Sequence, residues 1–298
     1  MNRFSSDVLG SYLKYFGFRA ICYLILILPK AASYALARAV GSLLYRRAKG
    51  KKAIVYENMR RIRPDAGPEE WDSLARRCFQ NYAVYWVDFL RCYWLSLDEV
   101  NTEIVPHGVQ WFDRCLEGGK GAVIALPHYG SWDLIGGWVG QRYDFWAVAE
   151  VLDPPAMTRF HTELRRRMAI QIIPLAANTV ERVIEVLMQN GIVALLSDRV
   201  LAGGSVEVEF FGSQVEFPVG PALLAVKLGS PIIPCLTIRK GKFFHGYVGP
   251  PLEVEITGDT RHDVRETTQK LARVYERYIR EDPTQWHMFQ PIWREPKA

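Results

Sequence analysis

The spacing of apolar and polar positions divides the chain into two parts. In the first part, residues 20–28 form an unbroken apolar run, a weaker run follows at 31–45, and residues 69–97 repeat apolar side chains at helical spacing. Beyond that part, short apolar runs bounded by glycine and proline alternate with amphipathic stretches. We therefore predict a helical N-terminal region over residues 1–100 and one α/β unit over residues 101–298.

The second part has the pattern of alternating strands and helices. Strands are predicted at 121–127, 144–150, 171–175, 191–198, 230–240 and 242–254, and helices at 132–139, 156–168, 179–189, 221–228 and 261–280. Strands that alternate with helices in this way are typical of a largely parallel sheet covered on both faces. We expect a twisted, mostly parallel central sheet flanked by helices.

The helical segment 69–97 is rich in aromatic side chains. Those at helical spacing are Tyr82, Tyr85, Trp86, Phe89, Tyr93 and Trp94. Most of them are expected to pack into the core, because aromatic side chains bury large apolar areas. The alternative is that they form the wall of a groove for an acyl chain.

Composition excludes several classes of protein. With 298 residues, 49% hydrophobic and 23% charged, the chain is neither disordered, collagen-like nor a coiled coil. The net charge of +5 is unevenly placed, since residues 1–100 hold 16 Lys/Arg against 9 Asp/Glu and the remainder holds 21 against 23. The asymmetry favours an attachment surface joined to a nearly neutral body.

The apolar run at 20–28 has only nine residues, whereas a helix that spans a bilayer needs about 20. Extending it to Tyr45 would bury Lys30 and Arg38, so a spanning helix is disfavoured. A secretory signal is also disfavoured, because no small-residue cleavage site follows the run. We expect a helical segment that lies in the membrane interface.

A basic stretch follows the apolar run. It contains Arg46, Arg47, Lys49, Lys51, Lys52, Arg60, Arg61 and Arg63, opposed only by Glu57. We predict that Arg46, Arg47, Lys51 and Lys52 contact an anionic membrane surface. The alternatives are a solvated helix face or a nucleic-acid arm, and the adjoining apolar run favours the membrane.

Other kinds of chemistry lack their motifs. The five cysteines show no close pairing and no C-x-x-C, which favours a reducing compartment, and the six histidines form no metal-ligand cluster. The chain has no G-x-S-x-G, Walker A or G-x-G-x-x-G motif, which disfavours a serine hydrolase, a P-loop enzyme or a dinucleotide enzyme. We expect no metal and no bound cofactor.

The strongest chemical signal is the sequence Pro-His-Tyr-Gly-Ser-Trp-Asp at 127–133, directly after a predicted buried strand. Reactive groups gather at the carboxyl ends of strands in open α/β sheets. We expect Ser131 to cap the next helix, Gly130 to leave room above the imidazole, and Asp133 to turn back to His128, which would act as a general base. The alternative is a loop histidine and a helix-start carboxylate without catalytic roles.

Further polar residues follow neighbouring strands. Glu150 ends the strand at 144–150, Arg165 lies on the next helix, and Asp198 and Arg199 end the strand at 191–198. We expect these four side chains to surround His128, with structural ion pairing as the alternative. A base without its own nucleophile would activate a hydroxyl group of a bound substrate.

As a set, these segments resemble the bacterial lipid acyltransferases that include the lipid A late acyltransferases and the phosphatidylinositol mannoside acyltransferases. The matching segments are ENMRRIRP (57–64), LPHYGSWD (126–133), VAE (148–150), IIPL (172–175), SDR (197–199), VEVEFFG (206–212), FPVGPALLA (217–225) and WHMFQPIW (286–293). The resemblance implies a glycerol-3-phosphate acyltransferase-like fold on the cytoplasmic face of the inner membrane. It implies transfer of a fatty acyl chain from acyl-CoA or acyl carrier protein to a sugar hydroxyl of a glycolipid.

The resemblance also implies roles for single residues. His128 would be the base, Asp133 would orient it, and Asp198, Glu150, Arg165 and Arg199 would line the site. The mannoside branch carries Glu-Arg-Asp where this chain has Asp198-Arg199-Val200.

The C-terminal WHMFQPIW favours a phosphatidylinositol mannoside acceptor over a lipid A precursor. Two alternatives from other classes are a thioester hydrolase and a non-catalytic lipid-binding module.

Overall fold

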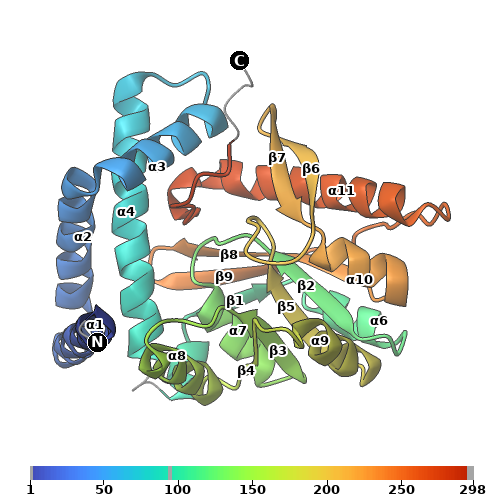
Figure 1. Ribbon diagram of the computed structural model, residues 1–298, viewed down its shortest axis with the longest axis horizontal. Helices are drawn as coiled ribbons and strands as arrows, with labels where there is room; N and C mark the ends of the chain where they lie inside the picture. The colour runs from blue at the N-terminus through green and yellow to red at the C-terminus, as the bar shows by residue number, and fades with distance from the viewer. Residues whose placement is uncertain (1–2, 93–95, 294–298) are drawn as a thin grey trace.

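Four helices form the N-terminal part of the molecule. The computed structural model describes residues 3–92 and 96–293, and its first helices are α1 (Arg3–Ile27), α2 (Lys30–Arg47), α3 (Lys49–Ile62) and α4 (Pro68–Arg91). Helix α4 stands between the α1–α2 pair and the α/β body (Figure 1). Its N-terminus follows helix-start rules, with a proline in the first turn beside Glu69 and Glu70.

The N-terminal helices leave much apolar surface exposed. Helix α1 exposes Leu13, Phe16, Ile21, Leu24 and Ile27, and α2 exposes Leu36, Val40, Leu43 and Leu44. Across residues 3–92 and 96–293, no helix has both the length and the apolar character needed to cross a membrane.

A seven-stranded sheet forms the centre of the body, in the order β1-β9-β8-β2-β5-β3-β4. Its strands are β1 (Ile104–His107), β2 (Ala122–Leu126), β3 (Phe145–Ala149), β4 (Gln171–Pro174), β5 (Ile192–Leu196), β8 (Ile232–Lys240) and β9 (Phe243–Val248). All neighbours pair in parallel except β8 and β9. The predicted α/β fold with a mostly parallel sheet is confirmed.

Helices cover both faces of this sheet. Helices α6 (Gln110–Leu116), α7 (Trp132–Gly140) and α8 (Pro155–Arg167) share a core with Ile124 and Ile192 on one face. On the opposite face, α9 (Thr179–Met188) packs on Val123 and Val193, and α10 (Gly220–Leu228) and α11 (Thr260–Glu281) pack on Ala125. Neighbouring strand residues point to opposite faces, so each buried strand supplies both cores.

Several elements differ from the sequence prediction. The structure adds α5 (Leu97–Asn101), β1, α6, the hairpin β6 (Ser205–Phe210)–β7 (Ser213–Pro218) and a 3-10 turn, η1 (Pro283–Gln285). In β6, buried Val208 and Phe210 alternate with exposed Glu207 and Glu209, a period of two that signals a strand. The strand predicted at 242–254 ends at Val248, before Gly-Pro-Pro.

Candidate active site

Two neighbouring parallel strands bring His128 and Asp198 together. Strands β2 and β5 pair in register, with Leu126 opposite Leu196. The backbone continues for two residues beyond the end of each strand, and the Ser197 amide donates to the Leu126 carbonyl at 3.0 Å. His128 and Asp198 therefore occupy matching positions just beyond the carboxyl edge of the sheet.

Asp198 is fully buried and accepts three hydrogen bonds. Its Oδ1 is 2.5 Å from His128 Nδ1, and its Oδ2 accepts from the His128 amide and from Trp286 Nε1, both at 2.8 Å. Burial favours the neutral acid, but the charge and hydrogen bonds of His128 and the bond from Trp286 outweigh it and lower the pKa of Asp198. An ionised carboxylate only accepts, so Nδ1 donates this hydrogen bond, and in the neutral form of the ring Nε2 is the acceptor.

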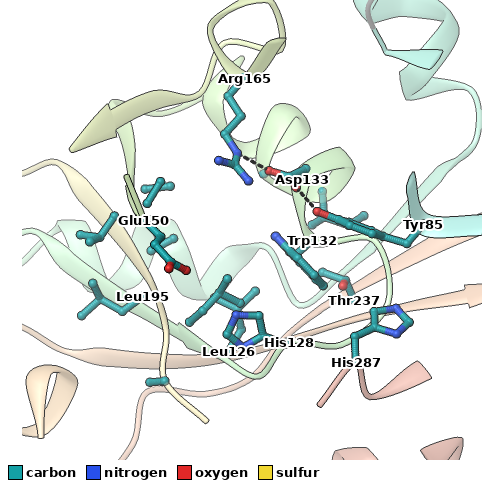
Figure 2. A pocket seen from close by; sticks show the side chains of 18 of the residues that line it. Tyr85, Leu126, His128, Trp132, Asp133, Glu150, Arg165, Leu195, Thr237 and His287 are labelled. Carbon is teal, nitrogen blue, oxygen red and sulfur yellow. Dashed lines mark hydrogen bonds and ion pairs between the residues drawn. The ribbon is translucent and has the colours of Figure 1, made fainter. Parts of the chain in front are cut away.

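The prediction that Asp133 orients His128 is wrong. Asp133 accepts from Arg165 Nε and from the Tyr85 hydroxyl, each at 2.7 Å. Figure 2 shows Trp132 between Asp133 and the imidazole. In the first turn of α7 the Asp133 carboxylate points toward α4 and α8, because its two hydrogen-bond donors lie on those helices. The imidazole is held instead by Asp198, which follows the neighbouring strand.

Backbone contacts fix the loop that carries His128. Gly130 has φ +63°, and a Cβ there would lie 2.0 Å from the Thr237 carbonyl oxygen. The Gly130 amide donates to the Gln285 carbonyl at 2.9 Å, and Thr237 Oγ1 donates to the Tyr129 carbonyl at 2.6 Å. Gly130 is thus required by a close backbone approach, rather than by room above the imidazole as predicted.

Ser131 occupies the N-cap position of α7 as predicted, but its side chain does not cap the helix. Its hydroxyl donates to Asp88 Oδ2 on α4 at 3.3 Å. The serine therefore connects the active-site loop to the N-terminal helices.

The other predicted polar residues lie around the same opening. Glu150 Oε2 and Arg199 Nη2 form an ion pair at 3.3 Å, and both side chains line the cavity that His128 borders. Arg165 lines it as well, with Nε engaged by Asp133 (Figure 2). The structure thus brings all four expected residues, Glu150, Arg165, Asp198 and Arg199, to the site of His128. Glu150, Arg165 and Arg199 are held in ion pairs, and Asp198 contacts His128 itself.

A large apolar cavity opens at this edge of the sheet, with a volume of about 1160 Å³. On β5, Ala194 and Leu196 line it from one face of the sheet and Leu195 from the other, so it extends over both faces at the carboxyl edge. Toward α7, its walls include side chains that are otherwise buried, such as Ile124 and Val139. A cavity of this size and character can enclose a long alkyl chain.

The N-terminal helices form part of the cavity wall. Ile21 and Leu24 of α1 and Leu36, Val40 and Leu44 of α2 line it and are also exposed on the molecular surface. The cavity therefore opens at the apolar surface of these two helices.

Some aromatic residues of α4 lie in the core and others line the cavity, which are the two locations expected from the sequence. Tyr82, Tyr85 and Trp86 line the cavity, whereas Phe89 is buried in the core. Tyr93 and Trp94 lie outside the described residues.

Sequence reasoning missed His287. Tyr129 and Trp286 form an antiparallel bridge, and the His287 amide donates to the His128 carbonyl at 2.7 Å. The His287 ring borders the cavity, and among the described residues neither ring nitrogen has a hydrogen-bond partner. Burial, with a smaller effect of His128, lowers the pKa of His287 to about 3, so the ring is neutral near neutral pH. The only signal was its place in the WHMFQPIW segment.

The predicted membrane-contacting residues lie at and after the end of α2. Arg46, Arg47 and Lys51 are exposed, form no ion pair within the described part of the chain, and Lys51 also lines the cavity. Lys52 is instead paired with Asp72 at 2.9 Å. Farther along, Arg60 and Arg61 pair with Glu57, and Arg63 pairs with Glu70, so the basic stretch is more neutralised than the sequence predicts.

No group of three or more His, Cys, Asp or Glu side chains within residues 3–92 and 96–293 is arranged to hold a metal ion.

Comparison with known proteins identifies relatives over most of the chain. The phosphatidylinositol mannoside acyltransferase of Mycobacterium tuberculosis (strain ATCC 25618 / H37Rv) is 34% identical over 228 residues, which cover 74% of this chain and 71% of that protein. The phosphatidylinositol mannoside acyltransferase of Mycolicibacterium smegmatis is 29% identical over 289 residues, covering 96% and 93%. The model of the family described as bacterial lipid A biosynthesis acyltransferase matches residues 3–295. The chain, with its histidine at the edge of an α/β sheet above an apolar cavity, belongs to this acyltransferase family.

Proposed function

We propose that this acyltransferase transfers a fatty acyl chain from an acyl thioester, acyl-CoA or acyl carrier protein, to a sugar hydroxyl of a phosphatidylinositol mannoside-type glycolipid, with His128 as general base. The observation that carries the proposal is the His128–Asp198 pair at the opening of the apolar cavity. The names of the relatives support the acceptor class.

The arrangement of the site supports direct transfer. His128 Nε2 takes the proton of the acceptor hydroxyl as its oxygen attacks the thioester carbonyl carbon. A C–O bond forms, the C–S bond breaks, and the imidazolium returns the proton to the departing thiolate. A thioester is already activated, so the step needs no acyl-enzyme intermediate, and holding both substrates at one opening supplies much of the rate.

Asp198 supports this role through its charge. The buried carboxylate fixes the tautomer of His128 and stabilises the imidazolium that forms during transfer. The negative charge that develops on the thioester oxygen needs a donor. The Gly130 amide already donates to Gln285, so we assign this role to the guanidinium of Arg165, which lines the cavity.

Membrane association belongs to the same proposal. Helix α2 exposes apolar side chains and ends at the cations Arg46 and Arg47, and Lys51 follows at the start of α3; none of these cations is paired with a described residue. Together with the exposed apolar side chains of α1, this combination suits the interface of an anionic bilayer. Because these helices also line the cavity, an acyl chain can pass from the lipid side to His128. The five cysteines are free and buried, which supports the reducing, cytoplasmic face of the inner membrane.

The test is acyl transfer by the full chain from palmitoyl-CoA to a phosphatidylinositol mannoside in vesicles. Replacing His128 with Ala should lower kcat by about 10²–10⁴-fold, while circular dichroism shows an unchanged fold. Wild-type turnover in this variant would exclude His128 as the base. Release of palmitate that is indifferent to the glycolipid would favour a thioester hydrolase, and binding without thioester consumption would favour a lipid-binding module.

A further inference from the structure

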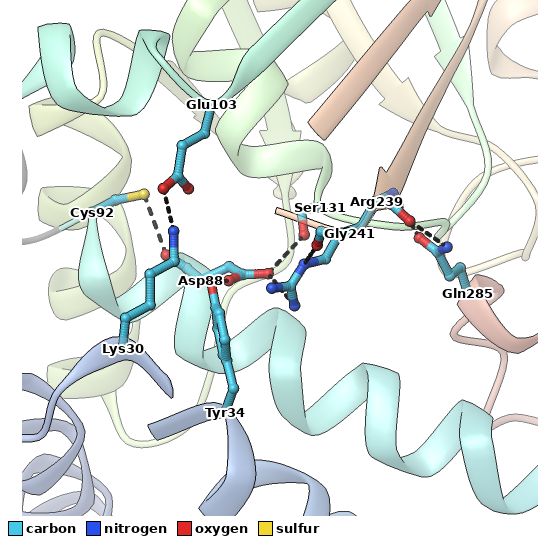
Figure 3. Close-up of polar contacts among 9 residues, drawn as sticks. All are labelled: Lys30, Tyr34, Asp88, Cys92, Glu103, Ser131, Arg239, Gly241 and Gln285. Carbon is cyan, nitrogen blue, oxygen red and sulfur yellow. Dashed lines mark hydrogen bonds and ion pairs between the residues drawn. The ribbon is translucent and has the colours of Figure 1, made fainter. Parts of the chain in front are cut away.

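A single buried carboxylate connects the N-terminal helices with the loop that carries His128 (Figure 3). Asp88 lies on α4, and its side chain is 1% exposed. Its Oδ1 accepts a hydrogen bond from the Tyr34 hydroxyl of α2 at 2.6 Å, and its Oδ2 accepts from Ser131 at 3.3 Å. Helix α2 and the active-site loop therefore share one acceptor.

Arg239 of β8 completes this cluster. Its Nη1 lies 3.6 Å from Asp88 Oδ2, and its guanidinium carbon lies 4.2 Å from the centre of the Tyr34 ring. Gln285 bonds to both the amide and the carbonyl of Arg239, at 2.8 and 3.0 Å, and its own carbonyl accepts from Gly130. The loop is thus held at Gly130 through Gln285 and at Ser131 through Asp88.

The charged groups around Asp88 come from two elements. Burial raises the pKa of Asp88 to about 6, against the charge of Arg239 and the hydrogen bond from Tyr34. Lys30 of α2 acts in the same direction as Arg239 and is itself paired with Glu103. Near neutral pH the carboxylate is charged and can accept both hydroxyl groups.

The side chain of Ser131 bonds to Asp88 and does not cap helix α7. A serine at the N-cap normally accepts a hydrogen bond from the first turn. Asp259 does so at the start of α11, whereas Ser131 makes no such bond and donates to Asp88.

We propose that Asp88 is a positioning residue that fixes the 128–131 loop relative to helix α2, so that the seating of α2 sets the orientation of His128. The inference rests on the proposed role of His128 as the base. It adds a physical connection between the helices proposed to contact the membrane and the reacting group.

The chain contains a matched control. Tyr34 and Tyr45 both lie on α2, are both buried, and both donate to an aspartate of α4. Tyr34 bonds to Asp88, whereas Tyr45 bonds to Asp72, which pairs with Lys52 and has no contact with the loop among those described. Tyr34→Phe and Tyr45→Phe each remove one hydroxyl from the same helix pair, and only the first touches the network of the active site.

The experiment compares Tyr34→Phe, Ser131→Ala and Tyr45→Phe with the wild type in the full chain, using palmitoyl-CoA and glycolipid vesicles. Tyr34→Phe and Ser131→Ala should each lower kcat by about fivefold to tenfold, the equivalent of one hydrogen bond, with KM for the thioester unchanged. Tyr45→Phe should keep the wild-type kcat. A second readout is the rate at which diethyl pyrocarbonate modifies His128, measured by mass spectrometry, which should change in the first two variants only.

Wild-type kcat and wild-type His128 modification in both Tyr34→Phe and Ser131→Ala would overturn the positioning role. An equal loss of kcat in Tyr45→Phe would also overturn it, because general packing of α2 on α4 would then explain the effect. If the wild type transfers no acyl group, the proposed function fails, and the modification rates still decide whether Asp88 positions the loop.

Discussion

At the scale of single residues, the site depends on which carboxylate reaches the imidazole. Asp133 is nearer in sequence, but Asp198 makes the contact because its strand lies beside β2. An aspartate side chain is long enough for this contact, since the register of the two strands already brings the backbones together.

Asp198→Asn should lower kcat by about 10²–10⁴-fold, because the amide no longer stabilises the imidazolium or fixes its tautomer. The variant keeps the size of the side chain, so its melting temperature serves as the control for folding. Steady-state acyl transfer is the measurement, and a rate near that of the wild type would show that the pair is structural.

Asp133→Ala should act on stability. It removes a buried carboxylate and leaves the half-buried guanidinium of Arg165 and the buried Tyr85 hydroxyl without their acceptor. Removing one partner of a buried ion pair costs about 3–5 kcal/mol. Urea unfolding measures the loss, and Glu163→Ala, which removes exposed ion pairs on α8, is the comparison that should change it little.

His287 should make stability depend on pH. Its folded pKa of about 3 lies below the ordinary value of 6.5, so the unfolded chain binds more protons between these values. Its contribution to stability is therefore complete above pH 6.5 and is lost toward pH 3, with a slope of about 1.4 kcal/mol per pH unit within that window. The free energy of unfolding of His287→Phe, measured across this pH range, should lack the loss that is assigned to His287. The same pH dependence in the variant and the wild type would contradict the prediction.

At the scale of elements, the N-terminal helices combine exposed apolar faces with a basic junction between α2 and α3. Only some of the cations that follow the apolar run are free for the proposed contact with lipid, because Lys52, Arg60, Arg61 and Arg63 are paired with acidic side chains. Which of these cations we expect to bind lipid therefore depends on their ion pairs with acidic side chains and not on the number of basic residues.

The triple variant Arg46→Ala, Arg47→Ala, Lys51→Ala should bind anionic vesicles about 100-fold more weakly, at about 1 kcal/mol for each cation. Sedimentation with vesicles at low and high salt measures the change. Lys52→Ala is the matched single control and should have less effect than Lys51→Ala. Equal binding by the triple variant and the wild type would place the attachment on the apolar faces alone.

At the scale of the whole molecule, the sheet edge, the α1–α2 surface and the cavity form one continuous path. The cavity extends over both faces of the sheet at the edge where β2, β5 and β3 end. The division into regions 1–100 and 101–298 stays a prediction.

An acyl chain in this cavity should stabilise the fold. A non-hydrolysable thioether analogue of palmitoyl-CoA at 100 times its dissociation constant should add about 2.7 kcal/mol to the free energy of unfolding. Thermal melting measures the shift, with coenzyme A alone as the control for the carrier. Equal shifts from both ligands would show that the cavity does not hold the chain.

The sequence by itself determined most of the strands and helices of the body, since apolar period and glycine–proline boundaries are local signals. It also placed His128, Glu150 and Asp198 at strand ends, where an open sheet gathers its reactive groups. It missed β1, the short helices α5 and α6 and the β6–β7 hairpin, although β6 carried an alternating pattern.

Only the tertiary structure decided which strand ends are neighbours. The order that puts β5 beside β2 selected Asp198 as the partner of His128, and the packing of α4 and α8 drew Asp133 toward Arg165. His287 and Asp88 reached the site through contacts between residues far apart in the chain. Such contacts depend on long-range packing, which leaves no periodic trace in a single sequence, whereas the elements themselves follow from neighbouring residues.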